Sequence, residues 1–85
     1  MPARTAIVAS RIGLQARPAS LVSLAAAGIG VPVVFEAHGR SINAASILSV
    51  LSLDVSHGDE VVVSADDPSA VDALIALLER DLTED

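Results

Sequence analysis

The 85-residue sequence has no cysteine, tryptophan, tyrosine or lysine, and its single aromatic residue is Phe35. Without thiols it forms no disulfides, which agrees with a reducing cytoplasm, and we expect no bound metal and no cofactor. Five arginines against eleven acids give a net charge of -6. That balance opposes nucleic-acid binding, because phosphate backbones require clustered basic residues. The longest apolar stretch, residues 24–35, is broken by glycine and proline and is too short for a bilayer, so we expect no membrane insertion.

The composition predicts one small domain, residues 1–85, located in the cytoplasm. Apolar residues make up 52% of the chain. With one aromatic among them, the core must be built from alanine, valine, leucine and isoleucine, which stabilise a fold through close interlocking of small side chains.

Hydrophobic periodicity and turn residues predict alternating strands and helices. In the first helix, Leu21, Leu24, Ala25 and Gly28 suggest an apolar stripe that ends at a glycine cap, and Asn43 is the expected N-cap of the second. The last helix carries an apolar stripe from Val71 through Leu74, Ile75 and Leu78 to Leu82. The expected elements are strands at 4–8, 31–37, 41–43 and 60–65, and helices at 16–28, at 46–53 and from about 68 to 82.

The order β-α-β-β-α-β-α indicates an α+β fold. We expect an open-faced two-layer sandwich, in which a four-stranded antiparallel sheet carries three helices on one face. The pattern alone leaves other two-layer α+β folds open.

A block at residues 13–20, Gly-Leu-Gln-Ala-Arg-Pro-Ala-Ser, carries the most specific signal in the chain. Residues 42–47 (Ile-Asn-Ala-Ala-Ser-Ile), 51–53 (Leu-Ser-Leu) and 58–60 (Gly-Asp-Glu) support it by their order and spacing. Together they resemble the HPr phosphocarriers over essentially the whole chain. The resemblance implies the fold described above and a role in the phosphoenolpyruvate-dependent sugar phosphotransferase system. Its partners would be enzyme I and the sugar-specific IIA components, and we expect the protein to act as a monomer.

The resemblance places Gln15 where HPr proteins have the histidine that carries the phosphoryl group. A carboxamide nitrogen is delocalised into its carbonyl and does not titrate in the accessible range, so Gln15 lacks the nucleophile that imidazole provides. Ala16 and Arg17 retain a phosphate cradle, because helix-start amides and a guanidinium both attract anions. The protein is therefore expected to be no enzyme, but a carrier or regulatory protein without its phosphoacceptor.

Two explanations of Gln15 remain open at this point. The chain is either a phosphocarrier whose histidine has been replaced deliberately to block transfer, or a natural regulatory relative like the catabolite-repression HPr-like proteins, whose corresponding residue is glutamine. In the second case the resemblance makes Ser46 the regulatory residue, phosphorylated by a serine kinase and read by a transcriptional regulator.

The apolar residues of the second helix suggest a docking surface, since a domain this small does not bury every side of it. Ile47, Leu48 and Leu51 are the candidate partner-binding residues. A third interpretation keeps the fold without phosphate, as an interaction domain that binds helices through these residues. His38 and His57 are expected at the surface, and neither is a substitute phosphoacceptor.

Overall fold

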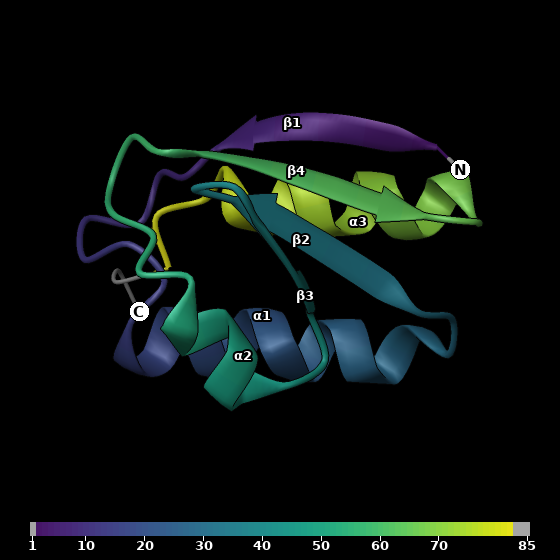
Figure 1. The fold of residues 1–85 in the computed structure, drawn as a ribbon, viewed down its shortest axis with the longest axis horizontal. Helices are drawn as coiled ribbons and strands as arrows, with labels where there is room; N and C mark the ends of the chain where they lie inside the picture. Colours follow the sequence, from purple (N-terminus) through teal and green to yellow (C-terminus); the bar gives the residue numbers. More distant parts are fainter. Residues whose placement is uncertain (1, 83–85) are drawn as a thin grey trace.

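Seven elements alternate along the chain in the order β1-α1-β2-β3-α2-β4-α3 (Figure 1). The computed structural model describes residues 2–82. This order and the open-faced sandwich predicted from the sequence are confirmed. The elements are β1 (Ala3–Ile7), α1 (Ala16–Ile29), β2 (Val33–Ala37), β3 (Arg40–Asn43), α2 (Ile47–Ser52), β4 (Glu60–Ala65) and α3 (Pro68–Leu78).

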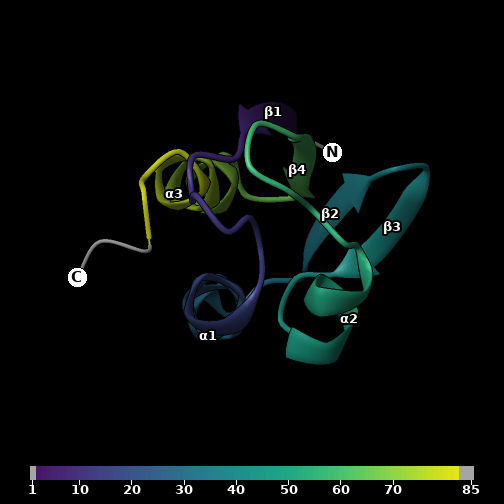
Figure 2. The ribbon, with the colours of Figure 1, turned by 90° about the vertical axis from the view of Figure 1, so that its left-hand side faces the viewer.

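The sheet has the strand order β1-β4-β2-β3, and all three neighbouring pairs are antiparallel. In its register Thr5 lies opposite Val62, and Phe35 lies opposite both Ile42 and Val63. All three helices cover one face of the sheet, as the end-on view in Figure 2 shows. Alternation along the strands therefore directs one set of side chains to the helices and leaves the other set on the open face.

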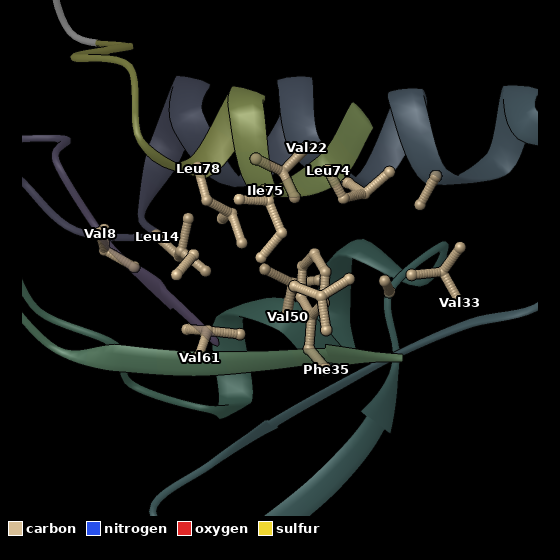
Figure 3. Packing of buried hydrophobic residues seen from close by; sticks show 14 of the residues in the cluster. Val8, Leu14, Val22, Val33, Phe35, Val50, Val61, Leu74, Ile75 and Leu78 are labelled. Carbon is tan, nitrogen blue, oxygen red and sulfur yellow. The ribbon is translucent and has the colours of Figure 1, made fainter. Parts of the chain in front are cut away.

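The core lies between the sheet and the helices. Phe35, the single aromatic residue, is fully buried at the centre of the sheet. Figure 3 shows Val22 of α1 and Leu74 and Leu78 of α3 pointing toward the sheet, on which Phe35 and Val61 are labelled. The other buried side chains are mainly valine, alanine and leucine, so the core has the small-residue composition expected from the sequence.

The buried face of α1 differs from the predicted stripe. Ala19, Val22 and Ala26 face the core, whereas Leu24 is 68% exposed and Gly28 lies on the surface. The helix is apolar on more than one side, and it is the side with the smaller residues that joins the core. It ends at Ile29 with Gly30 as the cap, since Gly30 has the left-handed φ of 89° that favours glycine.

The bounds of the other two helices also differ from the predicted ones. Ser46, and not Asn43, is the N-cap of α2. The carboxamide oxygen of Asn43 instead accepts a hydrogen bond from the Ala45 N–H at 3.0 Å, which forms a turn before the helix. Helix α3 ends at Leu78. Leu82 is buried, but it lies in the segment after the helix and is not part of the helical stripe.

The strands begin close to the predicted positions. Strand β4 has the predicted bounds, and β1 is shifted by one residue toward the N-terminus. Strand β2 begins at Val33 rather than Val31, because Pro32 has no N–H to donate to a ladder. Over residues 2–82, none of the helices combines the length and hydropathy that a bilayer crossing requires.

Candidate functional site

The loop between β1 and α1 is held by backbone hydrogen bonds to two other parts of the fold and by one turn of its own. The Ala9 N–H donates to the carbonyl oxygen of Leu78 at the end of α3, at 3.1 Å. The Gly13 N–H closes a turn onto the carbonyl of Ser10, and the Leu14 N–H donates to the carbonyl of Val55, each at 3.0 Å. Since Leu14 is also buried, the loop has a defined path up to the residue that follows it.

Gln15 is that residue, and it lies immediately before α1 with an extended backbone. Its side chain is exposed and makes no capping hydrogen bond to the described part of the chain. The first residue of the helix, Ala16, has a left-handed φ of 47°, which costs an L-residue about 1 kcal/mol. Arg17 follows in the first turn and is exposed. The three residues therefore form one exposed surface at the start of a 14-residue helix, and a helix start carries roughly half a positive charge.

A surface cavity of about 310 Å³ adjoins this helix start. Arg17, Leu21 and Ala25 line it from α1, and Arg80 lines it from the segment that follows α3. The carboxylate of Asp81 in its wall lies 2.9 Å from the guanidinium of Arg11, which partly compensates the negative charge beside Arg17.

Ser46 lies at the start of α2 and caps it. Its hydroxyl oxygen accepts a hydrogen bond from the Ser49 N–H at 3.4 Å, and its carbonyl accepts one from the Val50 N–H at 3.0 Å. Ser46 is half-buried. In the structure it therefore acts as a helix cap.

The candidate docking residues of α2 differ in exposure. Leu48 is 77% exposed and Ile47 is 40% exposed, whereas Leu51 is only partly exposed and packs against the core. Among the other exposed apolar residues, the sequence pattern did not indicate Ile12 in the β1–α1 loop or Leu24 on α1, which are 49% and 68% exposed. Spacing alone did not reveal them, because apolar residues in a loop or helix are more often buried.

Neither histidine lines the cavity beside Arg17, and His57 is exposed in the turn before β4. His38 is exposed in the β2–β3 turn, and its Nε2 lies 3.1 Å from Oδ2 of Asp59, so it has a partner that the sequence did not suggest. A larger cavity of about 400 Å³ lies beside this pair and includes neither Gln15 nor Arg17 among its lining residues. Among residues 2–82, no group of three or more histidine and acidic side chains is arranged to hold a metal ion.

An open antiparallel sheet with three helices on one face is the architecture of solved HPr phosphocarrier structures, and here a fixed loop presents Gln15 at the exposed start of the first helix. The family model described as "PTS HPr component phosphorylation site" matches residues 2–80. The chain belongs to the HPr family of the phosphotransferase system, whose members are phosphocarriers and not enzymes.

Individual relatives agree with this assignment. Phosphocarrier protein HPr of Streptomyces coelicolor is 48% identical over 63 residues, which cover 73% of this chain and 68% of that protein. The crystal structure of HPr-C-His from Thermoanaerobacter tengcongensis matches with a TM-score of 0.91 at 34% identity, covering 100% of this chain and 99% of the other.

A catabolite-repression protein is also similar. Crh of Bacillus subtilis, described as an intertwined dimer, matches with a TM-score of 0.72 at 34% identity, covering 95% of this chain and 97% of the other. The comparisons favour the phosphocarriers, because the Streptomyces relative has the higher sequence identity and the Thermoanaerobacter structure the higher TM-score.

Proposed function

We propose that this protein is an HPr-like component of the phosphotransferase system in which Gln15 occupies the phosphohistidine position. In this proposal it docks on enzyme I and on IIA components in the cytoplasm, but it does not accept their phosphoryl group. The observation that carries the proposal is the exposed position of Gln15 between the buried Leu14 and the helix start at Ala16. A side chain at this point reaches solvent and a partner, and phosphoryl transfer needs both.

The chemistry of Gln15 supports the loss of transfer. Its side chain offers an acceptor oxygen and two N–H donors, but no nitrogen lone pair available for attack on phosphorus. The helix-start amides and Arg17 can still attract a phosphoanion. The proposed site therefore binds the phosphoryl group of a partner without forming a covalent bond to it.

The test is incubation with phosphoenolpyruvate and enzyme I of Streptomyces coelicolor, first shown to label that organism's own HPr. We expect no label on the wild-type protein, no label on the Gln15→Ala control, and acid-labile phosphohistidine on Gln15→His. Label on Gln15 itself, or a Gln15→His variant that stays unlabelled with active enzyme I, contradicts the proposal.

The proposed docking surface consists of Ile47 and Leu48, with Leu51 supporting them from the core side. Leu48 supports this role most directly, because a leucine that is 77% exposed contributes little to the core and much to a contact with a partner.

For Ser46 we propose a regulatory role. Its hydroxyl already lies at the start of α2, so a phosphoryl group there would meet backbone N–H donors of the first turn. The test is incubation with ATP in extract of the source cell. We expect acid-stable phosphate on the wild-type protein and none on Ser46→Ala. The neighbouring Ser49→Ala variant, which keeps Ser46, serves as the control.

A further inference from the structure

Helix α2 is too short to hold its own shape. It contains six residues, and isolated helices below about 12 residues are marginal in water. Val50 is its one fully buried side chain. Its orientation therefore depends on the contacts at its two ends.

The C-terminal end is held by a residue from the sheet. Arg40, the first residue of β3, donates from Nη1 to the carbonyl oxygen of Ser52 at 2.7 Å. Its Nη2 donates to Oγ of Ser52 at 3.3 Å, and that hydroxyl donates to the carbonyl of Ser49 at 2.6 Å. One guanidinium thus binds the last residue of the helix through both its backbone and its side chain.

The interaction suits this end of the helix for two reasons. The last carbonyl groups of a helix have no partner within it, and they carry partial negative charge that favours a cation. The planar guanidinium also donates two bonds in a fixed geometry, which a lysine ammonium does not reproduce.

We infer that Arg40 is a positioning residue for docking on enzyme I. It holds α2 so that Ile47 and Leu48 face this partner. In a helix, residue i+4 bonds back to residue i, so the turn that ends at Ser52 begins at Leu48. Releasing Ser52 therefore loosens the turn that carries the most exposed leucine of the chain. This inference rests on the docking role proposed for α2.

Arg40 acts on a local element and not on the core. Its side chain is exposed, and a hydrogen bond at the surface contributes little to global stability. Its loss should therefore change the order of α2 much more than the unfolding of the whole protein.

The experiment compares Arg40→Ala with Arg4→Ala. Both variants remove one positive charge from an exposed strand residue, but Arg4 pairs with Asp72 of α3 and has no bond to α2. Binding to Streptomyces coelicolor enzyme I is measured by calorimetry, α2 amide exchange by NMR, and global stability by urea unfolding.

We expect Arg40→Ala to weaken binding about fivefold, the upper range for an exposed charged contact, while Arg4→Ala stays within about twofold of wild type. Amides of α2 should exchange faster in Arg40→Ala only, and the two variants should unfold at similar urea concentrations. Arg40→Lys keeps one donor for the Ser52 carbonyl and should recover part of the affinity.

Three results overturn the inference: wild-type binding by Arg40→Ala, an equal loss in Arg4→Ala, or weaker binding with unchanged α2 exchange. The Leu48→Asp variant separates this inference from the proposed function. If Leu48→Asp loses binding while Arg40→Ala retains it, only the role of Arg40 is wrong. If Leu48→Asp binds like wild type, the docking role of α2 fails and the inference fails with it.

Discussion

The backbone N–H of Leu14 donates a 3.0 Å hydrogen bond to the carbonyl oxygen of Val55, and this bond joins the loop carrying Gln15 to the segment between α2 and β4. Gly13 lies against the same segment with a left-handed φ of 67°. A Cβ atom at Gly13 would overlap the Val55 carbonyl oxygen, so only glycine permits this approach. The position of the proposed site thus depends on a contact between segments about 40 residues apart in the chain.

We expect Gly13→Ala to destabilise the protein and to displace the loop before Gln15. The matched control is Gly58→Ala, since Gly58 has a left-handed φ of 85° but open space where a Cβ would lie. The control should lose about 1 kcal/mol from backbone conformation alone, and Gly13→Ala should lose at least twice that. Urea unfolding of both variants measures the difference, and equal losses would show that the close approach to Val55 is unimportant.

Arg17 should assist phosphoryl transfer once a histidine is present. In the Gln15→His background we expect Arg17→Gln to slow labelling by about 100-fold, the usual effect of removing one donor to a developing anion. Arg4→Gln in the same background changes the net charge equally and is the control, since Arg4 pairs with Asp72 on α3. Initial rates with enzyme I and phosphoenolpyruvate provide the measurement. Equal rates for the two arginine variants would show that Arg17 is not part of the phosphate cradle.

Leu48→Asp should weaken partner binding without unfolding the protein. Its side chain is 77% exposed, so the free energy of unfolding should change by about 0.5 kcal/mol or less. Ile7→Asp provides a matched control, because Ile7 is an exposed apolar residue on β1 in the sheet, away from α2. We expect calorimetry with enzyme I to show a loss for Leu48→Asp only. A similar loss in both variants would point to net charge instead of a docking surface.

Asp67 should make α3 sensitive to acid. Its carboxylate accepts hydrogen bonds from Oγ of Ser69 at 2.8 Å and from the Ser69 N–H at 2.9 Å. The hydroxyl first, and then the amide, lower the pKa of Asp67 below its ordinary value. Because its pKa is lower in the folded than in the unfolded protein, the stabilisation is present above the unfolded pKa and is lost as pH falls through the folded pKa.

Asp67→Asn keeps a capping oxygen but does not titrate. The stability advantage of wild type over this variant should therefore shrink between about pH 5 and pH 2, as urea unfolding at each pH would show. Asp66→Asn removes the same charge from the neighbouring position and is the control. An advantage that stays constant over this range would contradict the assignment.

Much of the fold could be predicted from the sequence, because its signals are local. The valine run of β4, the acids before α3 with the proline at its first position, and the apolar spacing of α3 each act over a few residues, and they predicted the element order and the bounds of β4. The block around Gln15 likewise indicated the family and the helix start, since its residues are contiguous.

The sequence did not settle which of several equally apolar surfaces is buried, or which distant segments meet, because both depend on the assembled fold. Helix α1 is rich in alanine and leucine on more than one side, so the elements packed against it determined that Ala19 and Val22 are buried while Leu24 is exposed. The bond from Arg40 to Ser52 and the approach of Gly13 to Val55 join residues far apart in the chain. Periodicity does not encode such contacts, because they form only when the sheet and the helices are assembled.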